Sequence, residues 1–440
     1  MPRFPVAPSA VHETLARHVI PRGLPLVLDL ARSSGSFARD AATGEQYLDM
    51  ASFYGSNPLG YAHPGLRDPE TLERLAITSQ LKVGNPDLGS IYMAEFVETL
   101  AHTAAPPELP RYFIIEGGAL AVENAMKTAF DWKVQKSLER GLGERGSQIL
   151  HFERAFHGRS GYTLSVTNTD PAKTRHFPTF DWPRVPAPVR SFSGEADEAA
   201  RVEQAEAEVV RAIERAFDER AHDIAAILVE PIQCEGGDRH FRMEFLRTLR
   251  KLADEREALL IFDEVQTGLA ASGKWWAHEH AGVRPDVLAF AKKLQVGGVL
   301  AGKRIEDVDN VFRVPSRISS TWGGALVDMV RATRVLEIIE QDRLMSNATE
   351  RGAELLTGLA ELAARFPELT AARGLGLLVA FDLPSTEHRA KFLAAAYAEK
   401  LLLLSAGDRT VRLRPHLAVS AEDIAEALRR IGVALARSTG

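Results

Sequence analysis

The sequence predicts a large α/β domain with a doubly wound, mostly parallel sheet, accompanied by a smaller α+β domain. Between residues 111 and 291, apolar runs of buried-strand length alternate with segments of helical spacing. This alternation is typical of a parallel sheet with helices on both faces. Short strand-like runs before residue 50, and helices and strands after residue 325, indicate the second domain. We expect the first and last parts of the chain to form the small domain around the large one, with the ranges 1–65, 66–325 and 326–440.

The elements are predicted in chain order from spacing and turn residues. Residues 26–30 and 35–50 are expected to form short strands, the latter as a hairpin that turns near Thr43 and Gly44. A long helix is expected over roughly 325–344, and the C-terminal helix begins at a serine cap, Ser420. The central helices are expected over 119–136 and 241–257, and the buried-strand runs are 111–116, 148–153, 224–230, 258–265 and 286–291.

Composition and charge are those of an ordinary globular protein. Of the 440 residues, 45% are apolar and 25% are charged, and the length suggests about two to three domains. The formal net charge of −6 favours neither nucleic acid nor an anionic membrane as a partner. The single cysteine, Cys234, excludes an internal disulfide and fits a reducing compartment. Because no signal-peptide or membrane-spanning pattern is found, we expect a cytoplasmic protein without a membrane partner.

Three motifs of other enzyme classes occur in the wrong context. Residues 141–146 match G-x-G-x-x-G, but they follow a helix and precede a strand, whereas a dinucleotide site needs the opposite order. The His278-Glu279-His280 run has neither zinc-helix spacing nor a nearby cysteine. Residues 158–161 are one residue short of a serine nucleophile elbow. We therefore expect no metal site and no serine hydrolase.

Three other features lie where open α/β sheets bind ligands, at the carboxyl ends of strands. Asp263 ends one apolar run, and by itself it is equally consistent with a solvated acidic turn. Lys292 and Lys293 directly follow another run. A desolvated amine there suits Schiff-base chemistry, although a surface lysine pair is the commoner explanation. Glu116-Gly117-Gly118-Ala119 leads into a helix, where free backbone N–H groups suit a phosphate, and a plain strand–helix turn is the alternative.

Taken together, these residues resemble the class III (ω-) aminotransferases, and the resemblance extends over nearly the whole chain. It implies fold type I, a pyridoxal 5′-phosphate (PLP) cofactor and a homodimer with shared active sites. Lys292 is then the Schiff-base lysine and the proton shuttle. Asp263 keeps the pyridine nitrogen protonated, as an electron sink requires.

The resemblance also assigns the other contacts of the cofactor. Val265 is expected against one ring face, with Gln266 near the phenolic oxygen. Phe156 is expected to stack on the other ring face, and the adjacent His157 is a further cofactor-binding residue. Thr321 is expected to reach the phosphate of the neighbouring subunit, and the backbone that holds the phosphate comes from Gly118 and Ala119.

Within the family, long segments are most similar to members that transfer the ε-amino group of L-lysine to 2-oxoglutarate, giving L-glutamate and 2-aminoadipate 6-semialdehyde, which cyclises. Arg159 is the expected clamp for lysine's carboxylate and for the distal carboxylate of 2-oxoglutarate. Arg412 is expected to bind the α-carboxylate of 2-oxoglutarate, because a planar guanidinium suits bidentate binding. Glu235 is expected to cover Arg412 while lysine is bound, and Tyr54 is expected to narrow the substrate pocket.

Other functions remain open on the sequence alone. The nearest is another ω-aminotransferase acting on ornithine, acetylornithine or 4-aminobutyrate. A PLP aminomutase would turn over one substrate without a keto-acid acceptor. A PLP-binding regulatory module would hold the cofactor without accepting an amino group.

Overall fold

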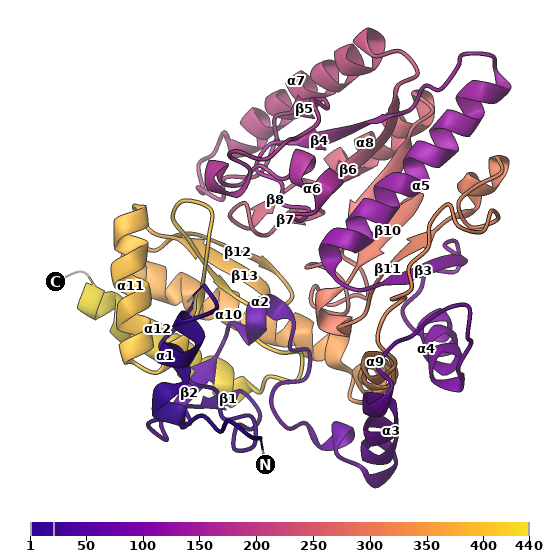
Figure 1. Cartoon of the computed structure of the whole chain (residues 1–440). Coiled ribbons are helices and arrows are strands. Elements are labelled where there is room, and N and C mark those ends of the chain that lie inside the picture. The colour runs from indigo at the N-terminus through magenta and orange to yellow at the C-terminus, as the bar shows by residue number, and fades with distance from the viewer. Residues whose placement is uncertain (1, 21–22, 439–440) are drawn as a thin grey trace.

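A seven-stranded sheet forms the centre of the larger part of the molecule in the computed structural model, which describes residues 2–20 and 23–438 (Figure 1). Strand β11 runs antiparallel to both of its neighbours, and the other pairings are parallel. The expected mostly parallel sheet is therefore confirmed. In spatial order its strands are β3 (Arg111–Ile115), β11 (Gly297–Ala301), β10 (Val287–Phe290), β9 (Leu259–Asp263), β6 (Ile224–Val229), β4 (Gln148–Phe152) and β5 (Arg184–Val185).

Both faces of this sheet are buried, as a doubly wound arrangement requires. Along β9, Leu259 and Ile261 belong to one hydrophobic core, and Leu260 and Phe262 belong to the other. Successive side chains of a strand point to opposite faces, so an unbroken apolar run is needed where both faces are covered. The first core includes α5 (Gly118–Glu139), and the second includes α7 (Glu198–Glu219) and α8 (Met243–Glu255).

The smaller part of the molecule combines segments from both ends of the chain, which lie side by side in Figure 1. Leu48 and Met50 share one hydrophobic core with Val379 and Phe381. A three-stranded sheet joins β1 (Phe37–Arg39), β2 (Gln46–Asp49) and β14 (Leu401–Leu402), and a four-stranded sheet joins β12 (Thr370–Leu375), β13 (Leu378–Asp382), β16 (Thr410–Leu413) and β15 (Leu404–Ala406). The helices of this part are α10 (Leu344–Arg365), α11 (Thr386–Ala398) and α12 (Ala421–Ser438).

The remaining helices connect the two parts or lie at their edges. Helix α9 contacts both α3 and α4, which form a separate group at the side of the large sheet (Figure 1). These elements are α1 (Val11–Ala16), α2 (Ser52–Gly55), α3 (Pro69–Gln80), α4 (Ile91–His102), α6 (Gly161–Val166) and α9 (Leu326–Gln341), with the short hairpin of β7 (Ile232–Gln233) and β8 (Arg239–His240). No helix within the described ranges has the length and apolar composition needed to cross a membrane.

One expectation about local structure is wrong, and one helix was not expected. Residues 26–30 form only a single bridge, between Leu28 and Asp40. The reason is local, since the Asp29 carboxylate accepts hydrogen bonds from the next backbone N–H groups and turns the chain. The long helix expected over roughly 325–344 is confirmed as α9, which ends at Gln341. The sequence reasoning missed the next helix, α10, which follows Arg343 and its left-handed φ of 53°.

Candidate active site

The candidate site lies at the carboxyl ends of three neighbouring parallel strands. Asp263 is the last residue of β9, Glu230 directly follows β6, and Lys292 comes two residues after β10. The lysine begins a short 3₁₀ helix with a left-handed φ of 42°. Such a conformation costs a residue with a Cβ about 1–2 kcal/mol, so the surrounding structure must hold it. The sheet therefore brings two acids and one amine together from segments far apart in sequence.

Asp263 is nearly fully buried, with 5% of its surface exposed. Its Oδ1 accepts a hydrogen bond from the Val265 backbone N–H at 3.0 Å, and its Oδ2 lies 2.8 Å from Nδ1 of His157. The second imidazole nitrogen, Nε2, is buried without a hydrogen-bond partner within the described chain. The carboxylate is thus held on both oxygens in one orientation.

Glu230 is a site residue that the sequence reasoning missed. Its Oε1 accepts a hydrogen bond from the Phe156 backbone N–H at 2.9 Å. Burial raises the pKa of Glu230 well above its ordinary value, and the charge of Asp263 raises it further. Burial and the neighbouring Asp263 carboxylate therefore both favour the protonated form of Glu230. The available signal was its position at the end of an apolar run, the same signal that identified Asp263.

Two adjacent lysines have different surroundings. Burial lowers the pKa of Lys292, and the nearby positive charge of Arg412 lowers it further. Lys293 donates from Nζ to the backbone carbonyl of Gln266 at 2.8 Å. Burial lowers the pKa of Lys293 to about 7. Within the described ranges, the Lys293 amine therefore has a hydrogen-bond partner and the Lys292 amine has none, which leaves the latter available for chemistry.

The N-terminus of α5 provides a place for an anion next to Asp263. The residue before the helix, Gly117, has a φ of 87° that favours glycine, and no side chain caps the helix. The first N–H groups of a helix lack partners within the helix. A Cβ on Gly118 would lie 2.7 Å from Cγ1 of Val265. The glycine therefore allows the helix start to approach the residues that follow β9.

Arg412 lies on β16, an inner strand of the four-stranded sheet, with 1% of its side chain exposed. Its Nη1 donates to Oε1 of Gln266 at 3.2 Å, and its Nη2 donates to Oε2 of Glu235 at 3.0 Å. Its Nε has no hydrogen-bond partner among the described residues. The structure thus brings Arg412, Glu235 and Gln266 together, and the guanidinium keeps one buried donor unused.

Tyr54 covers this arginine from a strained turn. The Arg412 guanidinium carbon lies 5.7 Å from the centre of the Tyr54 ring, and 56% of Tyr54 is exposed. Tyr54, with Ser52 and Phe53 before it, has a left-handed φ. The carboxylate of Asp49 holds the turn by accepting the N–H groups at its start, from Ala51 and Ser52.

Two cationic side chains lie near the ring of Phe156. The guanidinium carbon of Arg159 lies 5.9 Å from the ring centre, and Nζ of Lys173 lies 5.2 Å from it. Arg159 is exposed, and the described part of the chain gives it no ion-pair partner. The Arg159 guanidinium therefore has no carboxylate partner within the described chain.

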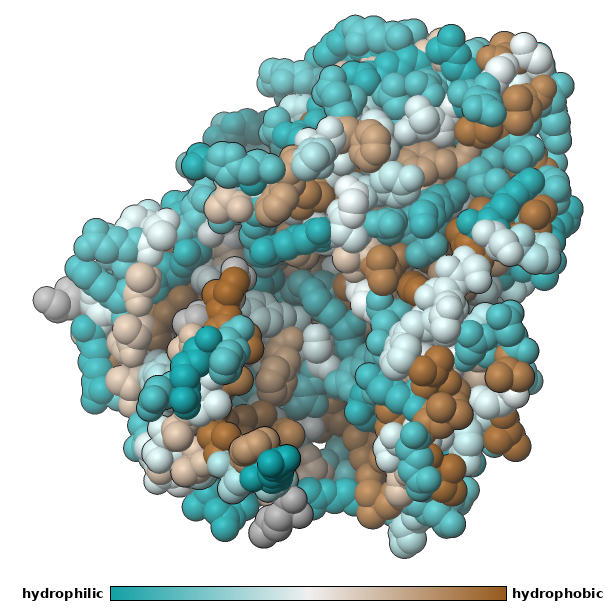
Figure 2. All heavy atoms as spheres, in the orientation of Figure 1, coloured by the Kyte–Doolittle hydropathy of each residue, from teal (hydrophilic) through white to brown (hydrophobic). Residues whose placement is uncertain are grey.

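Thr321 stands apart from the other predicted site residues. It is exposed, and Asn85 donates a hydrogen bond to its backbone carbonyl at 3.0 Å. Exposed apolar side chains lie nearby in the chain around Asn85, at Leu81, Leu88 and Ile91. Figure 2 shows apolar side chains gathered on the same side of the molecule, over α3 and α4.

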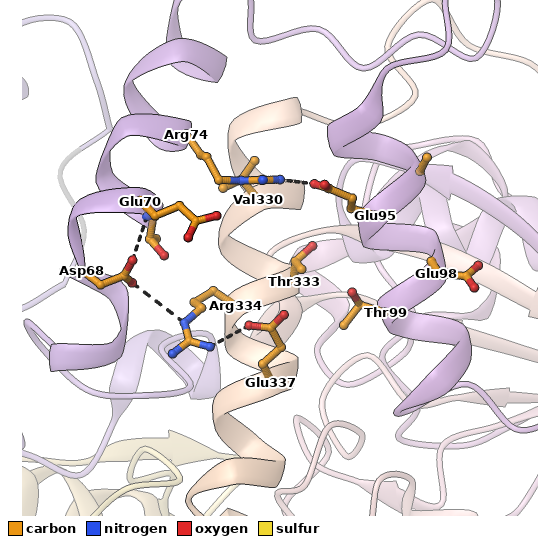
Figure 3. A pocket seen from close by; sticks show the side chains of 12 residues that line it. Asp68, Glu70, Arg74, Glu95, Glu98, Thr99, Val330, Thr333, Arg334 and Glu337 are labelled. Carbon is orange, nitrogen blue, oxygen red and sulfur yellow. Dashed lines mark hydrogen bonds and ion pairs between the residues drawn. The ribbon is translucent and has the colours of Figure 1, made fainter.

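A hollow of about 850 Å³ between α3, α4 and α9 contains none of the predicted site residues (Figure 3). Its lining includes five carboxylates and two arginines, so acidic groups predominate even though both arginines are paired. Arg74 pairs with Glu95, and Arg334 pairs with Glu337 at 2.6 Å. The size of this hollow therefore does not indicate where the chemistry takes place.

Comparison with known proteins identifies the family. The model of the family described as Aminotransferase class-III matches residues 19–435. The L-lysine-epsilon aminotransferase of Mycobacterium tuberculosis is 50% identical over 436 residues, which are 98% of this chain and 96% of that protein. The enzyme of the same name from Amycolatopsis lactamdurans is 48% identical over 99% of this chain and 98% of its own length. A solved structure, the lysine aminotransferase from M. tuberculosis in the internal aldimine form, has a TM-score of 0.96 at 48% identity and covers 98% of this chain and 100% of its own.

The residues described above fit the PLP cofactor that this family uses. The buried carboxylate of Asp263 suits a protonated pyridine nitrogen, and the amine of Lys292 suits the aldehyde. The uncapped start of α5 suits the phosphate. The chain belongs to the class III aminotransferases, and its cofactor is pyridoxal 5′-phosphate.

Proposed function

We propose that the protein transfers the ε-amino group of L-lysine to 2-oxoglutarate, giving L-glutamate and 2-aminoadipate 6-semialdehyde, which cyclises to a piperideine carboxylate. The names of relatives about half identical over nearly the full chain support this choice. The structural observation that carries it is the pairing of buried Arg412 with Glu235. A reversible partner for this arginine suits a site that accepts one substrate with an α-carboxylate there and another without it.

Lys292 is the residue that would hold the cofactor covalently, and Phe156 and Val265 would enclose the ring. Gly118 and Ala119 would hold the phosphate by their backbone N–H groups. When bound, PLP supplies an electron sink that stabilises negative charge on the substrate carbon attached to the amino group. Gln266 would orient its amide N–H toward the phenolic oxygen, since its carbonyl oxygen already accepts from Arg412.

Lys292 would carry out the proton transfers. In the first half-reaction its amine takes a proton from the ε-carbon of lysine, and in the second it returns a proton to the α-carbon of the glutamate being formed. A general base must be unprotonated when it acts. Burial lowers the pKa of Lys292 and so favours its neutral amine, which suits this role.

Asp263 would keep a proton on the pyridine nitrogen, and His157 acts through Asp263. The 2.8 Å contact between the imidazole and the carboxylate fixes the latter's orientation. Partners of this kind preserve the geometry of a reactive group without touching the substrate.

The two arginines divide substrate recognition. With lysine bound by its ε-amino end, Arg159 would hold the distant carboxylate, and Glu235 would cover Arg412. An unpaired buried charge is costly, so Arg412 needs this cover. When 2-oxoglutarate binds, Arg159 would take its γ-carboxylate, and its α-carboxylate would replace Glu235 on Arg412.

We further propose that the enzyme works as a homodimer in which Thr321 donates a hydrogen bond to the phosphate bound by the partner subunit. The exposure of Thr321, next to the apolar side chains near Asn85, supports an interface at this surface. Exposed apolar patches of this kind commonly mark protein–protein contacts.

The test compares amine donors in single-turnover reactions of the PLP-loaded enzyme. L-lysine, L-ornithine, N-acetylornithine and 4-aminobutyrate are mixed separately with the enzyme, and the loss of cofactor absorbance is followed. We expect the highest ratio of rate to dissociation constant with lysine, and mass spectrometry should detect the cyclised semialdehyde after 2-oxoglutarate is added. Faster reaction with another donor, or turnover of lysine without any keto acid, would contradict the proposal.

A further inference from the structure

Lys173 is a charged side chain that the proposed reaction leaves without a role. It is the last residue of a short 3₁₀ helix, Pro171–Lys173, whose start is capped by the Asp170 side chain. Its Nζ donates to Oε1 of Glu235 at 2.7 Å and to Oγ1 of Thr169 at 2.7 Å. Only 14% of the Lys173 side chain is exposed. A largely buried amine is therefore in contact with Glu235, the carboxylate that an α-carboxylate would replace on Arg412. We call this exchange of partners on Arg412 the switch.

Glu235 joins two cations through its two oxygens. Oε1 accepts from Lys173, and Oε2 accepts from Arg412 at 3.0 Å. Burial raises the pKa of the Glu235 carboxyl, but Arg412 and Lys173 lower it by more, so that the net pKa lies below its ordinary value. Glu235 is consequently an ionised carboxylate shared between two positive charges.

Arg412 and Lys173 each have contacts other than Glu235 that hold them in place, whereas the Glu235 carboxylate is partly exposed and has room to move. Arg412 is fixed in the β16 ladder and by its hydrogen bond to Gln266. Lys173 is fixed by Thr169 and by its position over the ring of Phe156. Glu235 is 29% exposed, about twice the exposure of Lys173. Loss of the Arg412 contact therefore need not remove the Lys173 contact.

We propose that Lys173 is a specificity-determining positioning residue, which retains Glu235 when an α-carboxylate displaces it from Arg412. The inference deepens the proposed function and rests on it. The relevant ligands are 2-oxoglutarate and glutamate, since both place an α-carboxylate on Arg412. Lysine bound through its ε-amino end places none there.

Charge neutrality gives the direction of the effect. Arg412, Lys173 and Glu235 together carry one net positive charge, and an incoming α-carboxylate makes the group neutral. Without Lys173 the group is neutral at the start and becomes negative when the α-carboxylate binds. Glu235 then remains close to that carboxylate without a partner, and in a largely buried site an uncompensated charge is costly. Loss of Lys173 should therefore weaken the binding of glutamate and 2-oxoglutarate and leave the binding of lysine unaffected.

The experiment measures two half-reactions of the PLP-loaded enzyme by stopped flow, one with L-glutamate and one with L-lysine. In Lys173→Met we expect the apparent dissociation constant for glutamate to rise about tenfold, the size expected from losing a hydrogen bond to a charged group. The constant for lysine should change by less than about twofold, and Lys173→Arg should retain most of the glutamate binding. Lys391→Met, an exposed lysine on α11, is the matched control and should behave as wild type.

A second comparison shows whether Lys173 acts through Glu235. In a Glu235→Gln background, which has no negative charge to retain, adding Lys173→Met should leave glutamate binding nearly unchanged. Three results would each overturn the proposal. They are an equal loss of binding for both amines, no loss of glutamate binding, and a loss of glutamate binding that persists in the Glu235→Gln background. If Lys173→Met does not fold, Lys173→Gln serves the same comparison.

The outcome is distinguishable from a failure of the proposed function. The glutamate half-reaction does not depend on which amine is the natural donor. If wild type reacts with glutamate but not with lysine, the proposed function is wrong, and the effect of Lys173 on glutamate can still be measured.

Discussion

Nδ1 of His157 lies 2.8 Å from Oδ2 of Asp263, and both side chains are buried at the end of β9. The other oxygen of Asp263 accepts the Val265 N–H. A carboxylate fixed by partners on both oxygens can direct its remaining lone pairs at one ligand atom. In the proposed site that atom is the pyridine nitrogen, so the geometry and the charge of Asp263 can be tested separately.

Asp263→Asn keeps the shape of the side chain but removes the charge that holds a proton on the pyridine nitrogen. We expect proton abstraction from the substrate to slow by several powers of ten, each factor of ten being about 1.4 kcal/mol of barrier. Single-turnover kinetics with lysine measure this step. A loss of less than about tenfold would show that Asp263 has another role.

Lys292 and Lys293 provide a direct chemical comparison, because they are adjacent but have different surroundings. Borohydride reduction of the PLP enzyme followed by peptide mass mapping should place the pyridoxyl group on Lys292. Lys292→Ala should lose far more turnover than cofactor binding, since the phosphate and ring contacts remain. Label on Lys293, or near-normal turnover of Lys292→Ala, would contradict the assignment.

Removal of the Glu235 carboxylate should impair the half-reaction with lysine more than the half-reaction with glutamate. In Glu235→Ala, uncovered Arg412 should attract lysine's own α-carboxylate and present the α-amino group for reaction. The lysine half-reaction should therefore be impaired more than the glutamate half-reaction, with an increased share of 6-amino-2-oxohexanoate. Stopped flow measures the two half-reactions, and mass spectrometry measures the lysine products. A ratio of half-reactions and a product split that both match wild type would rule out the switch, and Tyr54 would be the next residue to test.

A shared site predicts a specific result for mixed dimers. Thr321→Ala subunits combined with Lys292→Ala subunits should form heterodimers with one site that has both defects and one intact site. Activity should therefore exceed that of either parent dimer. Heterodimers without an intact site would show that Thr321 does not act across the interface.

The low pKa of Lys293 predicts a pH-dependent contribution to stability. Burial lowers this pKa from its ordinary value of 10.5 to about 7, so between these values the unfolded chain binds more protons than the folded one. The free energy of unfolding contributed by Lys293 should therefore increase with pH across that window. The apparent Tm of wild type minus that of Lys293→Met should rise from pH 7 to pH 10. A difference independent of pH would contradict the burial of a neutral amine, and Lys391→Met is the exposed control.

The sequence by itself predicted five strands of the central seven-stranded sheet and the positions of Asp263 and Lys292 at strand ends, whereas β11 and β5 were not predicted. Asp263 and Lys292 each follow an apolar run long enough for a buried strand, and parallel strands place their carboxyl ends at one edge. Local spacing and end signals were sufficient for these elements because the runs are continuous and both sheet faces are buried. Glu230 follows the apolar run of β6 in the same way as Asp263 follows β9.

The tertiary structure decided the contacts that join distant parts of the chain. One carboxylate, Glu235, lies between the cations Lys173 and Arg412. These residues come from a loop, a 3₁₀ helix and the four-stranded sheet respectively, and no local sequence pattern specifies that they meet. The turn at Asp29 was also missed, since a side chain that accepts nearby N–H groups ends an element without changing its apolar spacing. Spacing reports which face of an element is buried, whereas the partner on that face is selected only when the whole chain packs.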